Sequence, residues 1–250
     1  MVLIRELTET IQPRPSLHSA IASQIGSMIV KGRLSEGSTL PNEMSLGAQF
    51  GVSRTALREA IKVLASKGLV EVRRKTGTRV NGHAQWNVLD PEILAWMFSG
   101  KDLPVGLPDL MEVRMLIEPA GAAMAANRAT SEDVHRIRQG LLGMESTARV
   151  LPASVESDLR FHMAILGATH NAFMRPFGAL IQVALGGSFR LTSSNPDLYR
   201  STIPLHRKVF EAIETRKATK ARAAMTALLT QTQCDIDDQL RKLSARKKKR

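Results

Sequence analysis

The stretch VSRTALREAIKVLASKGLVEVRRKTGTRV, residues 52–80, joins a capped amphipathic segment to a short basic one. Ser53 can cap a helix over residues 54–67, because its hydroxyl can accept a free backbone N–H of the first turn. Apolar residues recur there at the period of one buried helix face, at Leu57, Ile61 and Leu64. After Gly68, residues 69–73 and 78–80 have β character on either side of a basic turn. The stretch therefore predicts a helix followed by a two-stranded hairpin.

Two more helices are expected before this stretch. Residues 16–35 have a helical period, with Ser16 as a possible cap. Asn42 can cap a short helix over residues 43–50, and a tight turn then leads into the next helix. Two short helices joined by a tight turn and followed by a hairpin form a winged helix-turn-helix.

The polar residues of this motif fit DNA. Arg54, Thr55 and Arg58 lie near the amino-terminal end of the second helix, the end that enters the major groove. Arginine there suits two-pronged contact with guanine. Basic residues surround the expected wing tip at Gly77, where they could meet phosphates or the minor groove: Arg73, Arg74, Lys75 and Arg79. Each charge alone fits a solvated surface, but the ordered combination indicates DNA binding.

The charge of the chain is concentrated at its ends. The net charge is +12, and residues 1–83 hold 12 Lys and Arg against 6 Asp and Glu. Residues 241–250 hold 7 basic residues and no acidic one, and the middle is close to neutral. This distribution indicates a polyanion-binding module joined to a body with another task. The basic tail is equally consistent with a solvated segment.

Bulk features place the chain in the cytoplasm by expectation. No apolar stretch approaches the ~18 residues of a membrane span, and the start does not resemble a secretory signal. Cys234 is the only cysteine, which suits a reducing compartment.

From residue 107 onward only helical patterns occur. The expected helices cover residues 108–127, 131–147, 153–170, 172–192, 198–216 and 218–243. We therefore expect a mainly α chain of four parts: a winged helix-turn-helix domain at 1–82, a linker and junction helix at 83–107, an all-α antiparallel helical bundle at 108–243 and a basic tail at 244–250. Trp86, Ile93 and Trp96 are expected to pack at the domain junction.

The metal-binding candidates lie in the helical part. Asp158 and His162 are four residues apart, so they share one helix face and can address one ion. His206 lies on another expected helix. One carboxylate and two imidazoles could hold a divalent metal with open positions for water or a ligand. The same spacing is also that of an ordinary Asp–His hydrogen bond.

Residues 37–80, GSTLPNEMSLGAQFGVSRTALREAIKVLASKGLVEVRRKTGTRV, resemble the DNA-binding domain of GntR-family transcription regulators. The resemblance implies that Arg54, Thr55 and Arg58 read DNA and that Gly77 lies at the wing tip. The chain departs from the family pattern at Met44, where an arginine that touches DNA is usual. It departs again at Ala56, where Pro or Thr is usual.

The helical part resembles the FCD ligand-binding domain of the FadR-type branch of that family. The resemblance lies in EVRMLIEPAGAAMAANRAT, DLRFHMAILGATHNAF and LHRKVFEAIETRKATKARAAM. It implies a metal, zinc by preference, held by Asp158, His162, His206 and a fourth histidine. That fourth position is Leu228 here, which implies either a three-ligand site or a metal-poor one.

A small anionic effector is expected beside such a cation. Arg114 and Arg190 could grip a carboxylate, and Thr192 and Ser193 could meet hydroxyls. Each arginine is equally consistent with a surface ion pair. Within the branch, QWNVLDPEILAWM and NRAT resemble regulators of sugar-acid operons, which implies an effector such as D-galactonate.

The sequence thus predicts a homodimeric repressor, not an enzyme, that leaves a palindromic double-stranded DNA operator when its effector binds. Two alternatives stay open. A metal-dependent hydrolase carrying a DNA-binding module would use the same three ligands to activate water. A non-specific architectural DNA binder would have no use for the large helical part.

Overall fold

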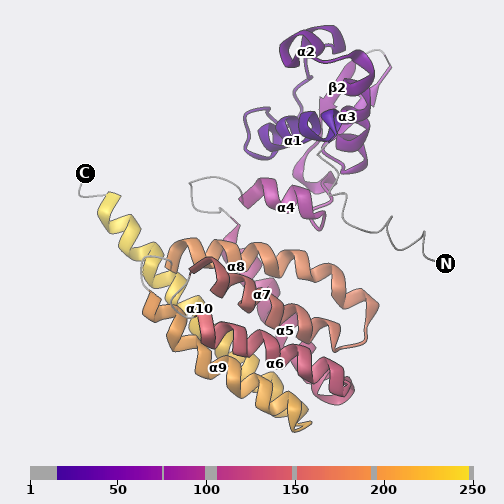
Figure 1. Cartoon of the computed structure of the whole chain (residues 1–250). Helices are drawn as coiled ribbons and strands as arrows, with labels where there is room; N and C mark the ends of the chain where they lie inside the picture. The colour runs from indigo at the N-terminus through magenta and orange to yellow at the C-terminus, as the bar shows by residue number, and fades with distance from the viewer. Residues whose placement is uncertain (1–15, 75, 99–105, 148–150, 193–195, 248–250) are drawn as a thin grey trace, which may run out of the picture. The chain divides into compact units, whose positions relative to one another are not determined.

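The computed structural model describes residues 16–74, 76–98, 106–147, 151–192 and 196–247. The chain divides into two compact units, Met1–Met97 and Phe98–Arg250, and helices dominate both (Figure 1). The expected mainly α fold is confirmed. The division falls inside residues 83–107, the segment expected to link the two domains.

The helix-turn-helix of the first unit consists of α2 (Glu43–Phe50) and α3 (Arg54–Ser66). Asn42 caps α2 and Ser53 caps α3, each accepting the backbone N–H three residues on, at 2.8 and 3.2 Å. Gly51 ends α2 with φ of 65°, a left-handed conformation in which a side chain would be strained. These caps fix the tight turn that sets α3 across α2.

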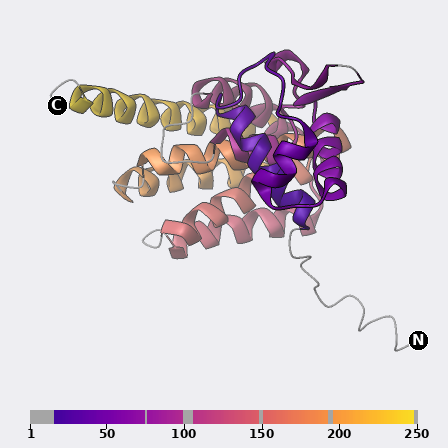
Figure 2. The same cartoon turned by 90° about the horizontal axis from the view of Figure 1, so that it is seen from above.

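The wing is an antiparallel hairpin of β1 (Val70–Arg73) and β2 (Gly77–Val80), which stands at the edge of the first unit (Figure 2). Gly77 begins β2 with φ of 83°, which explains why glycine occupies this position. A bridge from Thr39 to Arg79 adds the segment before α2 to the sheet.

The core of the first unit lies between α1 (Leu17–Val30), α3 and α4 (Pro91–Phe98). Trp96 of α4 packs on Gly26 of α1, where a Cβ would lie 2.3 Å from a ring carbon. Its indole nitrogen donates to Ser23 Oγ at 3.1 Å. The same core contains Ile25, Leu57, Leu64, Leu69, Trp86 and Ile93. Trp86, Ile93 and Trp96, which were expected to pack at the domain junction, therefore belong to the core of the first unit.

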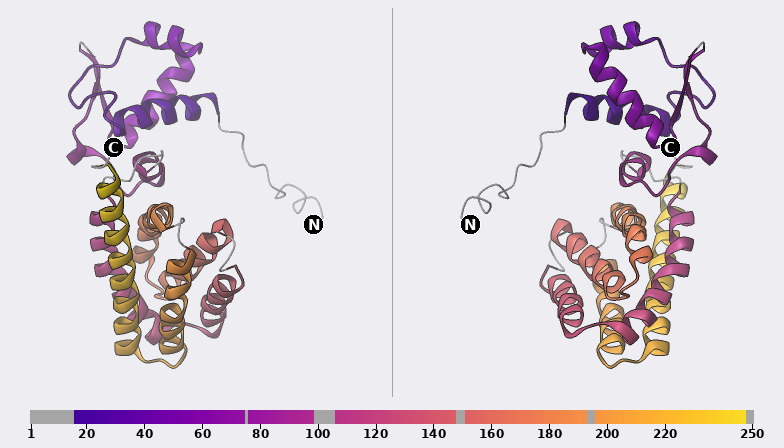
Figure 3. Two further views of the ribbon diagram at one scale, coloured as in Figure 1. Left: turned by 90° about the vertical axis from the view of Figure 1, so that its left-hand side faces the viewer. Right: turned by 90° about the vertical axis from the view of Figure 1, so that its right-hand side faces the viewer.

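The second unit is a bundle of long helices: α5 (Leu107–Arg128), α6 (Ser131–Thr147), α7 (Leu151–Gly167), α8 (Gly178–Thr192), α9 (Pro196–Glu214) and α10 (Ala218–Lys247). The short helix η3 (Ala172–Phe177) precedes α8. The helices α9 and α10 form a hairpin, orange to yellow in Figure 3, and α5 packs along α10. No helix among the described residues is long and apolar enough to cross a membrane.

Close packing of α6 on α7 brings the bundle's candidate site residues inward. A Cβ at Gly140 of α6 would lie 2.7 Å from Phe161 Cα of α7, so the two backbones touch there. Phe161 is fully buried, and its neighbour His162 contacts Glu118 of α5 and His206 of α9. The centre of the bundle is therefore where polar side chains of several helices meet.

Candidate DNA-binding surface and metal centre

The first half of α3 exposes the three residues expected to read DNA. Arg54 and Arg58 have side chains that are 74% and 60% exposed, and Thr55 is also exposed. None of the three is used in the core. An exposed polar face at the amino-terminal end of such a helix is what entry into a major groove requires.

The basic residues of the wing are in different environments. Arg74 is exposed, as is Gly77 at the start of β2. Arg73 is paired with Glu71 at 2.9 Å, and Arg79 Nε donates to the Gly37 carbonyl at 2.9 Å. Lys75 lies outside the described residues. Arg73 and Arg79 would have to give up these local contacts to meet DNA, whereas Arg74 forms neither of them.

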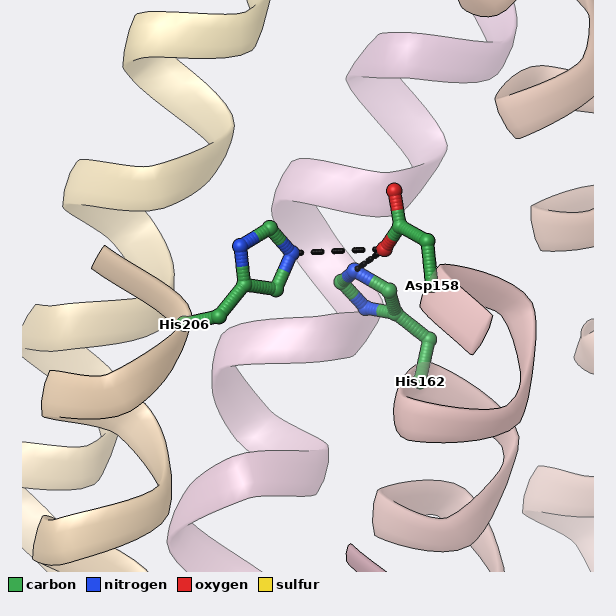
Figure 4. Close-up of side chains that lie close together, drawn as sticks. All are labelled: Asp158, His162 and His206. Carbon is green, nitrogen blue, oxygen red and sulfur yellow. Dashed lines mark ion pairs between the residues drawn. The ribbon is translucent and has the colours of Figure 1, made fainter. Parts of the chain in front are cut away.

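Three potential ligands meet in the second unit (Figure 4). Asp158 Oδ1 lies 3.1 Å from His162 Nε2 and 3.3 Å from His206 Nε2. Asp158 and His162 come from α7 and His206 from α9, and both histidines are buried. The three ligand atoms lie within 4.8 Å of one another, close enough to address one ion.

A second layer of contacts orients the two imidazoles. His206 Nδ1 lies 2.9 Å from the Thr202 carbonyl, so Nδ1 carries the proton and Nε2 offers its lone pair to the site. His162 Nδ1 is paired with Glu118 Oε2, and Glu118 is paired in turn with Arg114. A metal-binding histidine typically has such a carbonyl or carboxylate behind it.

Several atoms of the cluster lack a hydrogen bond despite their closeness. Among the described residues, Asp158 Oδ1, His206 Nε2, His162 Nδ1 and Glu118 Oε2 are buried with no partner in hydrogen-bonding geometry. Buried polar groups without partners are unfavourable. Because a cation between Asp158 Oδ1 and the two Nε2 atoms would satisfy the first two directly, the residues fit a metal ion.

The charges of the cluster also favour a cation. Burial opposes ionisation, but the Arg114 and His162 charges outweigh it and lower the pKa of Glu118 to about 2. The carboxylates of Glu118 and Asp158 likewise overcome burial and raise the pKa of His162 to about 9. The imidazoles of His162 and His206 hold the pKa of Asp158 well below its usual range. Asp158 on one side of the His162 ring and Glu118 on the other are therefore both ionised, and their charge favours a cation there, either a protonated His162 or a metal ion.

The position of the fourth ligand implied by the family resemblance faces the same place. Leu228 of α10 is 1% exposed and lines a small cavity together with the three candidate ligands. Its side chain offers no donor atom. Among the described residues, three potential ligand atoms therefore meet in this cluster, a number that would leave positions for water or another ligand on a bound ion.

The residues expected to bind an effector lie partly outside the described part of the chain. Arg114 is buried, lines the cavity and donates to Glu118. The side chains of Arg190 and Thr192 and all of Ser193 lie outside the described residues. The cavity volume is about 50 Å³.

Glu118 is a residue of this cluster that the sequence did not indicate. Its spacing of four from Arg114, just before Pro119 on α5, was the available signal. That spacing alone suggests an exposed ion pair, whereas both side chains are only 2% exposed. The burial of the pair, and its contact with His162, depend on how α5 packs on α7.

Comparisons with known proteins match both units. Residues 17–80 match the family described as "Bacterial regulatory proteins, gntR family", and residues 109–231 match the FCD domain. The galactonate operon transcriptional repressor of Escherichia coli K12 is 33% identical over 214 residues, covering 85% of this chain and 93% of that protein. The putative L-lactate dehydrogenase operon regulatory protein of the same organism is 33% identical, covering 86% and 84%.

A solved structure shares the fold. It is that of Lar, which controls the expression of the Listeria monocytogenes agr system, with a TM-score of 0.62 and 19% identity. The match covers 89% of this chain and 97% of that one.

Proposed function

The chain belongs to the gntR family of bacterial regulatory proteins, with an FCD domain in its second unit, and on that premise we propose that it represses an operon for the use of a sugar acid such as D-galactonate. It is a DNA-binding transcription regulator. In the proposal it binds a palindromic operator as a homodimer in the cytoplasm, and the sugar acid releases it.

The observation that carries the proposal is the exposed face of α3. Arg54, Thr55 and Arg58 lie in solvent on a capped helix beside a wing, which suits sequence readout in the major groove. In a symmetric dimer two such helices would read two half-sites, about one helical turn apart or a multiple of it.

The ligand cluster of the second unit supports the proposal that this unit is a metal-dependent sensor. We propose that Asp158, His162 and His206 hold a divalent ion, zinc by preference, with Glu118 and Thr202 as their second layer. The bound ion would supply a positive charge to which a carboxylate and a neighbouring hydroxyl can bind. Arg114 and, from the sequence, Arg190, Thr192 and Ser193 are proposed to complete the recognition of the acid.

The size of the cavity bears on how the effector acts. A cavity of about 50 Å³ is far below the several hundred Å³ typical of ligand sites. A six-carbon acid therefore requires the helices around the cavity to separate. Because the ligand would bind only the widened form, it would shift the population of conformations, which is the requirement for regulation.

The experiment is DNA binding by the full chain with and without acid. Footprinting on the DNA around its own gene should show a protected palindrome, which D-galactonate with zinc should release. The Arg58→Ala variant should bind this operator duplex about 10- to 100-fold more weakly than the wild type, because one good two-pronged base contact disappears. Arg160→Ala is the matched control: Arg160 is a similarly exposed arginine paired with Glu156 on α7.

The proposal would be contradicted if footprinting showed no protected sequence, or if no sugar acid released the protein from the DNA. The hydrolase alternative has no support among the relatives, which are regulators. An assay showing turnover of the acid by the zinc-loaded chain would revive it.

A further inference from the structure

One acidic residue lies among the arginines of the DNA-binding face. Glu43 is the first residue of α2, and its side chain reaches across to α3. Arg58 Nε donates to both of its carboxylate oxygens, at 2.9 and 3.1 Å. Arg54 Nη2 lies 3.8 Å from the nearer oxygen. One carboxylate is therefore shared by two guanidinium groups that the proposed function places against DNA.

This contact limits how Arg58 can meet a base. With Nε committed to Glu43, a two-pronged contact with guanine is left to the two terminal nitrogens. The contact also holds a long side chain in one conformation before DNA arrives. Part of the entropy that a free arginine would lose on binding is then already lost in the free protein.

The carboxylate also changes the charge of the surface. Arg54 and Arg58 are four apart on α3, so they are neighbours, and both lie near the positive amino-terminal end of the helix. Glu43 offsets this accumulation of positive charge. Because its side chain is 39% exposed, it would also repel phosphates that approach the face without base pairs in register.

We propose that Glu43 is a specificity-determining residue of the DNA-binding face, which positions Arg58 and Arg54 for base readout and weakens their contact with phosphates elsewhere. The inference rests on the proposed function as a sequence-specific regulator. It predicts opposite effects of one substitution on two kinds of DNA, which a purely structural role would not produce.

The experiment compares the full-length wild type with Glu43→Gln. A duplex library with about 20 randomised base pairs, two helical turns, yields the preferred sequence of the wild type. Fluorescence anisotropy then gives Kd for that duplex and for a scrambled one at several salt concentrations. For Glu43→Gln we expect weaker binding to the selected duplex and tighter binding to the scrambled one. The ratio of the Kd for scrambled DNA to the Kd for selected DNA should be at least about tenfold smaller than in the wild type. The salt slope on scrambled DNA should steepen by about one, since a freed arginine can meet a phosphate.

Two further variants separate position from charge. Glu59→Gln removes the same charge from α3, but the ion pair of Glu59 is with Lys62 at 2.8 Å, whereas those of Arg54 and Arg58 are with Glu43. The ratio of the two Kd values should therefore stay within about twofold of the wild type. Glu43→Asp keeps the charge on a side chain too short for the double contact. It should weaken binding to the selected duplex without tightening binding to the scrambled one.

The outcomes are distinguishable. A Glu43→Gln variant that keeps the wild-type ratio, or that loses affinity equally for both duplexes, overturns the inference and leaves the proposed function standing. A wild type that selects no sequence overturns the proposed function and the inference with it. Thermal unfolding by circular dichroism should show all variants folded, because every substituted side chain is on the surface.

Discussion

Met44 is an exposed residue of α2 that is expected to affect the strength of DNA binding. It is the second residue of α2, next to Glu43, and its side chain is 76% exposed with no core to fill. The regulators that this chain resembles usually have an arginine there that touches DNA. An exposed methionine contributes no charge to a phosphate, so we expect this face to bind DNA with one contact fewer.

Met44→Arg is therefore expected to tighten DNA binding. The gain should be a few-fold at about 0.15 M salt, with the slope of log K against log salt steeper by about one, because one more phosphate is neutralised. Anisotropy titrations over a range of salt measure both quantities. Gln49→Arg places the same charge at the exposed far end of α2, and a gain equal to that of Met44→Arg would attribute the effect to net charge instead.

Leu228 is another position at which the chain lacks the functional side chain that the family resemblance implies, here at the buried cluster. It lines the cavity with Asp158, His162 and His206 but donates no electron pair. Leu228→His should add a fourth ligand and lower the Kd for zinc by more than about tenfold, since four protein ligands complete a tetrahedral site. Competition with a chelating dye measures this, with Leu228→Gln as the polar control that is a poor zinc ligand. An equal or weaker affinity of the histidine variant would show that the position does not face the ion.

The sequence could predict only some of these residues. Asp158 and His162 follow from spacing along one helix, and His206, a candidate on another expected helix, was grouped with them by the family resemblance. Glu118 and Glu43 could not be found that way, because their partners His162 and Arg58 lie on other helices, 44 and 15 positions away along the chain. Such contacts are set by the packing of α5 on α7 and of α2 on α3.

At the scale of elements, the local signals that succeeded were caps and stops. Asn42, Ser53 and Gly51 act as expected, and α6 has the expected bounds of residues 131–147. One expected helix over residues 172–192 is instead η3 followed by α8. Pro176 lies at that change, and a proline cannot donate the backbone hydrogen bond that a continuous α-helix needs.

Asp133, near the start of α6, is expected to contribute to the free energy of unfolding. Asp133 accepts the backbone N–H and the hydroxyl of Thr130 at 2.8 and 2.7 Å, and pairs with Arg136 and His170, each at 2.7 Å. Burial opposes its charge, but these donors hold the pKa of Asp133 well below its usual range. Asp133→Asn should therefore lower the free energy of unfolding by about 1–2 kcal/mol at pH 7.

The pH dependence of that loss follows from the direction of the shift. A carboxyl group with a lowered folded-state pKa stabilises the protein above its unfolded pKa of about 4, and this stabilisation fades as the pH falls further. Urea unfolding of the wild type and Asp133→Asn should differ most at pH 5 to 7 and converge toward pH 3. A difference that stays constant, or grows, as the pH falls would contradict the role of the charge.

At the scale of the whole molecule, the two units can be observed separately. The chain has two tryptophans, Trp86 and Trp96, and both lie in the core of the first unit. The candidate metal centre lies in the second unit. Tryptophan fluorescence therefore follows unfolding of the DNA-binding unit, while far-ultraviolet circular dichroism follows all the helices.

The sequence could predict this division of labour but not the identity of the effector. Charge placement and the change from hairpin to pure helix indicated a DNA-binding module joined to a body with another task, and the family resemblance implied that this body binds a ligand. In the proposed function, the chemistry of the effector depends on the shape of a cavity that, at about 50 Å³, is too small for a sugar acid in this conformation. No local pattern of residues encodes how far helices from several parts of the chain separate when a ligand enters.

Metal and ligand should therefore stabilise one unit selectively. Zinc at 100 times its Kd adds about 2.7 kcal/mol to a unit that binds it only when folded, which for a unit of this size raises Tm by roughly 5–10 °C. The rise should occur in the circular dichroism transition, with little change in tryptophan fluorescence, and a chelator should reverse it. D-Galactonate should add a further rise only with zinc present, whereas D-galactose, which lacks the carboxylate, should not. His206→Ala should abolish both effects, since it removes the one ligand from α9; a rise that survives in this variant would place the metal elsewhere.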